Sequence, residues 1–426
     1  MKEKCLRPFL FAALVLAVCF AGSVAQAATV IVGTCQTGVQ FATIQAAVNA
    51  SPAGTKIDIC PGSYPEQVTI TKKLSLLGIA SGTSDAAVVV APANGVVVNA
   101  TDIFGNAVAA QIFVENASSV SISHLTVDGI ANGLSGCQTQ FEGVYFQNSS
   151  GTITDNVVRN QILDPADEGC QDGLAINVES ATGTPAVTVS YNSVRNYDKN
   201  GITADGLGSG APGPNVTVKD NTVIGVGATP AIAQNGIQIG FGATASVTDN
   251  YVVDDIYTGP YYGSSGILIY ASTGVTVSGN TIESTQLAVA TANDPTYGVA
   301  DDASVTNNHI GGTQNFDAID LCSSHNVASS NTIYGSAQSG VHADDECLGP
   351  GSSPSGNDNT IQTNTINEAC AGILEGSGTG NNFGTNTFLN VITTLVSGDT
   401  CTPPGAQTRA GKHASLRPSP YRSNVK

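Results

Sequence analysis

A short pattern, V-T-V-x-x-N-x-V/I, recurs through the second half of the chain and constrains the fold more than any other feature. Examples are VTVSYNSV, VTVKDNTV and VTVSGNTI. Its asparagine returns every 22 to 33 residues, at Asn192, Asn221, Asn250, Asn280, Asn308, Asn331, Asn364 and Asn386. A period of this size indicates a repeat architecture in which each copy is one small structural unit.

A second element alternates with the first, and it is a small residue followed by an aliphatic one. It occurs at Gly143-Val144, Gly173-Leu174, Gly201-Ile202, Gly236-Ile237, Gly266-Ile267, Gly298-Val299, Ala318-Ile319, Gly340-Val341 and Gly372-Ile373. Each repeat thus holds at least two short strands that cannot bury themselves alone. Stacking the repeats about 4.8 Å apart pairs equivalent strands in parallel and forms one continuous core. This predicts an all-β solenoid of about a dozen coils.

Two further features fit such a solenoid. The recurring asparagine suits a tight turn because asparagine tolerates left-handed backbone angles, and stacked asparagines can hydrogen-bond along the column. Near the start, FATIQAAVNA (residues 41–50) places Phe41, Ile44 and Val48 at helical spacing. We expect this short helix to cap the open end of the core and prevent end-to-end association.

The two ends of the chain differ from the repeats in composition. Residues 1–27 combine a basic start, an apolar run and a small-x-small cleavage pattern, which predicts a secretory signal peptide. Residues 403–426 are basic and rich in turn formers, and we expect a disordered tail. No later run is long and apolar enough to span a membrane. We therefore expect a secreted monomer, located outside the cell, in the periplasm or on the cell surface.

Eight cysteines remain outside the expected signal peptide. An even count in an exported chain indicates disulfides. Their clustering suggests four local pairs: Cys35 with Cys60, Cys137 with Cys170, Cys322 with Cys347, and Cys370 with Cys401. No CxxC motif or Cys/His zinc spacing is present, so a structural zinc cluster is not expected.

The charge of the body is strongly negative. Residues 28–408 hold 7 basic and 32 acidic residues, a formal charge of −25. This balance argues against nucleic acid or an anionic membrane surface as a partner. The acidity fits either the solubility of a long exposed surface or a site for Ca²⁺ or for acid chemistry on a sugar. We expect no other cofactor.

The repeats resemble those of right-handed parallel β-helix proteins of the pectin lyase-like superfamily, and the resemblance covers the body, residues 28–402. The stretch FATIQAAVNASPAGTKIDICPGSYPEQVTITKKLSLLGI resembles the beginning of pectin methylesterases, with their G-x-Y-x-E element at Gly62, Tyr64 and Glu66. The catalytic motifs of those esterases are missing, and the chain has no tryptophan for L-G-R-P-W. Asp344-Asp345 resembles the D-D pair of polygalacturonases, but their R-I-K motif is absent. The resemblance implies the β-helix fold and, for an enzyme, hydrolase or lyase chemistry rather than esterase chemistry.

Aligning the repeats on the second element places outward side chains in columns. With the aliphatic residue pointing inward, the residues one and three positions later point outward. On this alignment Asp302, Asp320, His342 and Asp344 share one outer face across three consecutive coils. Carboxylates about 5 Å apart, or about 9–10 Å two coils apart, bracket the separations in retaining and inverting glycosidases. We predict these four as catalytic residues, with His342 as acid or base; a Ca²⁺ site is the alternative.

Five more residues are predicted to bind substrate. Asp205, Gln238 and Tyr270 lie in the same outer columns; Tyr270 could belong to a sugar-stacking platform or fill a loop packed on the solenoid. Arg159 and Arg195 each follow a column asparagine by three residues and should stack on successive coils. Two arginines would clamp uronic-acid carboxylates, and an arginine base is typical of pectate-lyase-like chemistry. A surface ladder of salt bridges is the other interpretation.

Three functional hypotheses follow. The first is a secreted enzyme that acts on an extracellular polysaccharide, most simply a pectin-like, uronate-containing one, by hydrolase or lyase chemistry in an outer-face groove. The second is a non-catalytic carbohydrate-binding or cell-surface β-helix. The third is a purely structural or adhesive exported protein.

Overall fold

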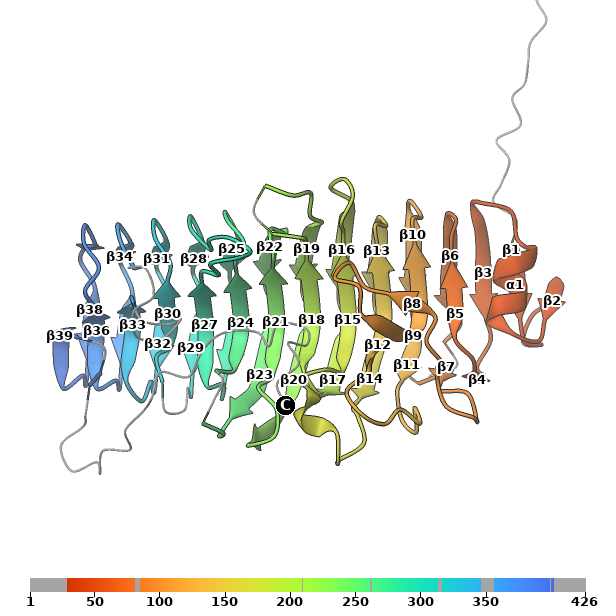
Figure 1. The fold of residues 1–426 in the computed structure, drawn as a ribbon, viewed down its shortest axis with the longest axis horizontal. Helices are drawn as coiled ribbons and strands as arrows, with labels where there is room; N and C mark the ends of the chain where they lie inside the picture. Colours follow the sequence, from red (N-terminus) through yellow and green to blue (C-terminus); the bar gives the residue numbers. More distant parts are fainter. Residues whose placement is uncertain are drawn as a thin grey trace, which may run out of the picture.

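The computed structural model describes residues 29–80, 85–208, 210–260, 263–312, 316–345, 356–398 and 400–401. Over these ranges the chain winds into stacked coils, and each full coil contributes one strand to each of three parallel sheets. Figure 1 shows the coils side by side along the long axis, in chain order from the N-terminal end. The expected signal peptide (1–27) and the expected tail (403–426) lie outside the described residues.

Sheet A, the first sheet of each coil, has 14 strands within the described ranges. In spatial order they are β2 (Val39–Phe41), β1 (Thr29–Val32), β3 (Thr55–Ile59), β6 (Leu74–Gly78), β10 (Val120–Ser123), β13 (Gly151–Thr154), β16 (Ala186–Ser190), β19 (Asn215–Lys219), β22 (Thr244–Thr248), β25 (Thr276–Ser278), β28 (Ser304–Thr306), β31 (Val327–Ser329), β34 (Thr360–Gln362) and β37 (Asn382–Phe383).

Sheet B follows sheet A in each coil and has 12 strands in the part of the chain that the structure describes. They are β4 (Gly62–Pro65), β7 (Ala87–Val90), β11 (Thr126–Asp128), β14 (Val157–Gln161), β17 (Ser193–Tyr197), β20 (Thr222–Thr229), β23 (Tyr251–Tyr257), β26 (Thr281–Glu283), β29 (His309–Gly311), β32 (Thr332–Tyr334), β35 (Thr365–Asn367) and β38 (Thr387–Leu389).

Sheet C completes each coil and has 13 strands among the described residues, including the antiparallel edge strand β8 (Ala100–Thr101). The parallel strands are β5 (Val68–Ile70), β9 (Ala107–Glu115), β12 (Thr139–Gln147), β15 (Leu174–Glu179), β18 (Asn200–Asp205), β21 (Asn235–Gly240), β24 (Ser265–Tyr270), β27 (Leu287–Ala292), β30 (Ile319–Cys322), β33 (Ser339–Ala343), β36 (Ala371–Glu375) and β39 (Thr393–Ser397).

The core is a continuous column of aliphatic side chains from all three sheets. One coil illustrates it: Val189 of β16, Val194 of β17 and Ile202 of β18 are fully buried and belong to the same cluster. The alternation of inward aliphatic and outward polar residues produces this core, because successive side chains of a strand point to opposite faces. The predicted all-β solenoid is confirmed.

A short helix, α1 (Ile44–Ala50), packs on the first coils at the N-terminal end, where the sequence predicts it, but Phe41 belongs to strand β2 and not to the helix (Figure 1). Thr43 caps it by accepting a hydrogen bond from the Ala46 nitrogen. The Glu66 carboxylate accepts hydrogen bonds of 2.8 Å from the backbone nitrogens of Ile44 and Gln45. Glu66 therefore holds the start of the helix against the second coil.

A ladder of asparagines runs along the turn between sheets A and B. In each coil the side-chain nitrogen donates to the side-chain oxygen of the next asparagine at 2.9–3.1 Å, linking Asn156, Asn192, Asn221, Asn250, Asn280, Asn308, Asn331, Asn364 and Asn386. The predicted hydrogen-bonded column is confirmed. The prediction that asparagine itself adopts the left-handed conformation is wrong, since the preceding residue has the positive φ, as at Asp220 (55°) and Asp249 (57°).

Three predicted disulfides are present: Cys35–Cys60, Cys137–Cys170 and Cys370–Cys401. Cys322 is also disulfide-bonded, and its predicted partner, Cys347, lies outside the described residues. Each observed bond joins residues 25 to 33 positions apart, so the disulfides pin neighbouring coils rather than distant parts of the chain.

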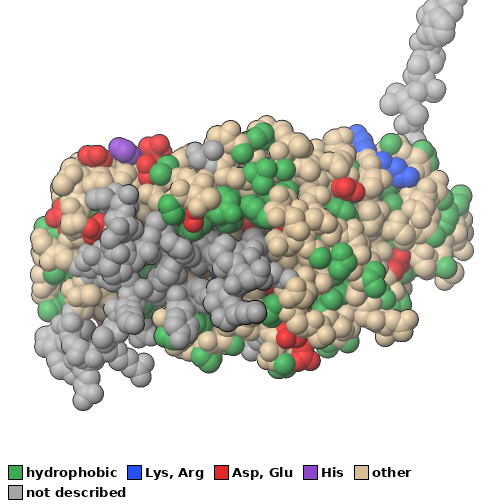
Figure 2. All heavy atoms as spheres, in the orientation of Figure 1, with side chains coloured by type: hydrophobic (Ala, Val, Ile, Leu, Met, Phe, Trp, Pro, Cys, Tyr) green, Lys and Arg blue, Asp and Glu red, His purple; other side chains and the backbone are tan. Residues whose placement is uncertain are grey.

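The surface is dominated by uncharged groups. In Figure 2 the acidic side chains of the visible face form small separate groups among tan and green atoms. A search of the described residues for a helix that could cross a membrane finds none.

Candidate functional site

The outward columns of sheet C position most of the predicted site residues. The strand register aligns one column as Tyr145, Asn177, Thr203, Gln238, Leu268, Ala290, Asp320, His342 and Leu374. The sequence alignment is correct for seven of these nine positions and wrong at two, where the structure has Asn177 and Ala290 instead of Ala175 and Ala300. Each error arises because the small-aliphatic step was assigned to the wrong residues of a coil.

Asp302 does not belong to this face, and its predicted place in the column is wrong. The sheet C strand of its coil is β27, in which Val289 pairs with Ile267 and Ile319. Gly298-Val299 lies beyond that strand, where Gly298 closes a small bridge with Asp294. Asp302 therefore falls in the turn before β28, with a φ of 61°.

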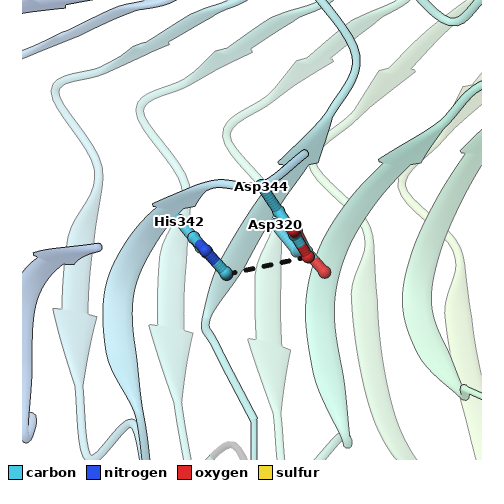
Figure 3. Close-up of side chains that lie close together, drawn as sticks. All are labelled: Asp320, His342 and Asp344. Carbon is cyan, nitrogen blue, oxygen red and sulfur yellow. Dashed lines mark ion pairs between the residues drawn. The ribbon is translucent and has the colours of Figure 1, made fainter. Parts of the chain in front are cut away.

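Asp320, His342 and Asp344 do come together. Asp320 pairs with His342 across β30 and β33, and Asp344 follows the end of β33. One ligand atom from each residue lies within 4.8 Å of the others. Figure 3 shows the three side chains converging, with the ion pair between the His342 Nδ1 and the Asp344 Oδ2, 3.8 Å apart, as a dashed line. All three are buried, at 6%, 1% and 2% exposure respectively.

A fourth acid, Asp317, orients the imidazole. Its Oδ2 lies 3.1 Å from the His342 Nδ1. Its Oδ1 accepts hydrogen bonds from the backbone nitrogen (2.9 Å) and the hydroxyl (2.6 Å) of Ser339. The carboxylate is thus fixed on one side and holds the histidine ring on the other. Sequence reasoning missed Asp317 because it precedes the strand, outside the aligned columns.

The electrostatics of this group favour a protonated acid. Burial raises the pKa of Asp320 well above its usual range, and the nearby Asp344 and Asp317 carboxylates raise it further, while His342 opposes the shift. Losing the proton would place another negative charge in a desolvated site beside existing ones. Asp320 therefore holds its proton more tightly than an ordinary aspartic acid, as a proton donor requires.

A second acid group lies nearer the middle of the same face. The Asn177 Nδ2 donates to the Oε1 atoms of Glu142 (3.0 Å) and Glu179 (3.1 Å), so these two oxygens lie at most about 6 Å apart. The Tyr145 hydroxyl donates to the Glu179 Oε2 at 2.6 Å. All four side chains are fully buried. Burial is the largest cause that raises the pKa of Glu142 well above its usual range, and the negative charge of Glu179 raises it further.

The pKa of Glu179 is raised to about 7, mainly by burial and then by the negative charge of Asp102. Sequence reasoning missed this group because it aligned Gly173-Leu174, whereas Val144 pairs with Ile176. The alternation Ile176-x-Val178, which matches Val144-x-Phe146, was the signal that would have found it.

Asp205 and Gln238 extend this second group by one and two coils. The Gln238 amide donates to both Asp205 oxygens at 3.3 Å. Burial and the charge of Glu179 raise the pKa of Asp205 well above its usual range. Both predicted binding residues thus lie on the face where the sequence placed them, but they are fully buried.

A hairpin formed by β8 and the start of β9 covers the second group. The Ile103 backbone nitrogen donates to the Glu179 Oε2 at 3.2 Å. Phe104 makes edge contacts with Phe241 (5.3 Å between ring centres) and Tyr297 (6.1 Å). The contacts of this hairpin therefore contribute to the burial of Glu179.

Tyr270 belongs to the same aromatic cluster as Phe104, Phe241 and Tyr297 and does not lie alone on the surface. It is 2% exposed, packs on Phe241 with ring centres 5.5 Å apart, and its hydroxyl donates to the Asp294 carboxylate. This placement fits the second sequence interpretation, a tyrosine that fills a loop packed on the solenoid.

The two arginines stack as predicted, but on sheet B. Arg159 of β14 pairs in register with Arg195 of β17. The Arg159 guanidinium binds Asp128 at 2.8 Å and Asp85 at 2.9 Å. The sheet B position separates both arginines from Asp205, Gln238 and Tyr270, and the Arg159 contacts fit the salt-bridge interpretation better than a uronate clamp.

Among the described residues, Asp320, His342 and Asp344 are the group that could hold a metal ion. Two carboxylates and an imidazole suit a divalent ion, and the Asp317 contact would fix the imidazole ring. The same arrangement offers a proton donor, Asp320, next to a second carboxylate, Asp344. The site can therefore support either acid–base chemistry or cation binding.

Comparisons with known proteins agree with this architecture. A family model described as a right handed beta helix region matches residues 208–388. No curated protein sequence matches the chain. The fold of this protein is a right-handed parallel β-helix.

Similar solved structures include the GH136 lacto-N-biosidase from Eubacterium ramulus, with a TM-score of 0.56 and 13% identity over 87% of this chain and 68% of that chain. They also include PfbA, a surface adhesin of Streptococcus pneumoniae, with a TM-score of 0.49 and 13% identity over 83% and 86%. A third is the A-module of the Azotobacter vinelandii mannuronan C-5 epimerase, with a TM-score of 0.45 and 15% identity over 84% and 94%.

Proposed function

We propose that this protein acts on an extracellular polysaccharide at the outer face of sheet C, with Asp320 as proton donor and Asp344 as its carboxylate partner. The observation that carries the proposal is the convergence of Asp320, His342 and Asp344 within 4.8 Å. A proton donor beside a second carboxylate is the arrangement that glycoside hydrolysis needs.

Hydrolysis is favoured over elimination. Asp320 would protonate the glycosidic oxygen as the bond to the leaving sugar breaks. Asp344 would attack the anomeric carbon, and water would then release the covalent intermediate. The ligand atoms of the two carboxyl groups lie within 4.8 Å of each other, and a close pair is what the retaining course uses. Elimination would need an arginine base beside Asp320 and Asp344, but Arg159 and Arg195 lie on sheet B.

Pectin and polygalacturonate are the first substrates to test, since the repeats resemble those of pectin lyase-like proteins. A uronate chain would be repelled by the acids of this face, so Ca²⁺ between the two would be needed for tight binding. Disulfides between neighbouring coils support an oxidising, extracellular setting.

A non-catalytic carbohydrate-binding or cell-surface role is the second candidate. The burial of Asp320, His342 and Asp344 favours it, because a substrate must reach a side chain that is only 6% exposed. On this view the group holds a divalent ion that stiffens the C-terminal coils.

The test is a cleavage assay on pectin, polygalacturonate and neutral glycans, with and without Ca²⁺ and a chelator. Asp320→Asn and Asp344→Asn should each lower kcat by a factor of about 10² to 10⁴, since each removes one proton-transfer or nucleophilic role. Asp302→Asn, an acid outside the group, is the matched control and should keep activity. Arg195→Ala should keep it as well.

Three results would count against the proposal. Binding without any cleaved product would support the non-catalytic role. Unsaturated products lost in Arg195→Ala would indicate elimination instead. Equal activity of Asp320→Asn and the wild type would remove Asp320 from the reaction.

A further inference from the structure

Sheet B carries a hollow at its C-terminal end, on a different face from the acid groups of sheet C. It encloses about 540 Å³ and extends from Glu283 of β26 to Leu389 of β38. The five strands that line it are neighbours in the sheet, β26, β29, β32, β35 and β38. At about 4.8 Å per coil, it follows the long axis for about 19 Å.

A missing side chain creates this hollow. The register aligns Glu283 with Gly311, Gly311 with Tyr334, and Tyr334 with Asn367. Gly311 therefore leaves a gap in the outward column between a carboxylate on one side and an aromatic ring on the other. The next column supplies His309 and Thr332, both exposed polar side chains.

Two exposed tyrosines of sheet B have a glutamate next to their hydroxyl groups, and one of them, Tyr334, lines the hollow. Tyr334 is 50% exposed, and the neighbouring Glu368 carboxylate raises the pKa of its hydroxyl group. Two coils before Gly311, the Tyr251 hydroxyl donates to the Glu283 Oε2 at 3.1 Å. The Tyr251 ring is thus held at its hydroxyl, and much of the Tyr334 ring stays accessible.

We propose that this hollow binds a neutral oligosaccharide that lies along the axis of the solenoid. The exposed face of Tyr334 can stack on the apolar face of a sugar ring, as amphipathic aromatic rings do at binding surfaces. Glu283, His309 and Thr332 supply acceptors and donors for the sugar hydroxyls. Neither Lys nor Arg lines the hollow among the described residues, and Glu283 repels carboxylates, so an uncharged glycan fits better than a uronate.

Two substitutions test the site without disturbing the fold. Tyr334→Ala removes the stacking surface. Gly311→Val fills the gap, and the backbone tolerates it, because a Cβ at Gly311 would meet only the Tyr334 carbonyl oxygen at 3.8 Å. Tyr191→Ala, which removes another exposed tyrosine (54%) away from the hollow, is the matched control.

The experiment is calorimetric titration of the full chain with cellohexaose, maltohexaose, mannohexaose, chitohexaose and hexagalacturonate, with circular dichroism of each variant as a check on folding. At least one neutral hexamer should bind more tightly than hexagalacturonate. Tyr334→Ala and Gly311→Val should each weaken that binding about tenfold, and Tyr191→Ala should not.

The proposal is overturned if no neutral hexamer binds, if hexagalacturonate binds best, or if both hollow variants bind like the wild type. Asp320→Asn and Asp344→Asn should leave this binding intact. The proposal for the hollow and the proposal for the sheet C site are therefore tested independently of each other.

Discussion

At the scale of single residues, several side chains in this protein serve to satisfy backbone groups that the coils leave open. Glu66 accepts from the first two backbone nitrogens of α1, and Tyr64 donates to the Cys60 carbonyl oxygen at 2.7 Å. These are two residues of the G-x-Y-x-E element. The element therefore has a structural task at the start of the solenoid, which explains how it occurs here without esterase motifs.

Glu66→Gln should lower the free energy of unfolding by about 1–2 kcal/mol, because a neutral amide replaces a charged acceptor at a helix N-terminus. Chemical denaturation measures the change. Glu115→Gln on β9 removes a similar carboxylate away from α1 and should change stability by less than about 0.5 kcal/mol. Equal effects of the two substitutions would show that Glu66 does not stabilise the cap.

At the scale of structural elements, the asparagine ladder joins each coil to the next. The buried Asn250 side chain donates to Asn280, Val218 and Thr248, and it accepts from Asn221. A single interior asparagine therefore satisfies groups in its own coil and in both neighbours. At the last position, Asn386 is only half-buried and has a ladder partner on one side within the described residues.

Asn250→Ala should destabilise the protein by about 3 kcal/mol, because it leaves several buried donors and acceptors without partners. Asn386→Ala at the end of the ladder should cost clearly less. Denaturant titration of both variants measures the difference. If the end position proved as sensitive as the interior one, ladder hydrogen bonds would not be the source of the stability.

At the scale of the whole molecule, the outer face of sheet C concentrates buried acids whose charged forms are unfavourable. The pKa values of Glu142, Glu179, Asp205 and Asp320 are all raised, with burial as the largest cause. Between pH 4.5 and about 7 the folded state keeps the Glu179 proton that the unfolded state has released. Linkage then requires stability to fall as pH rises through this window.

The melting temperature should therefore be higher near pH 5 than near pH 7. The free energy of unfolding falls between these two pH values, and Glu179→Gln should remove about 2–3 kcal/mol of that fall, because a neutral amide has no proton to lose. Calorimetric scans across the window measure it. A variant whose melting temperature falls as steeply with pH as that of the wild type would show that Glu179 is ionised in the folded protein.

The repeat alone determined the coils, the core and the asparagine column, because stacking identical units is the one way such short strands can bury their apolar faces. It also brought Asp320, His342 and Asp344 together, since their coils follow the regular alternation. The tertiary structure alone decided the register where loops interrupt that alternation. It moved Asp302 into a turn, brought Glu179 beside Glu142, and placed the arginines on another sheet. The hollow at Gly311 is likewise decided by the fold, because it depends on which side chains of five successive coils lie next to one another.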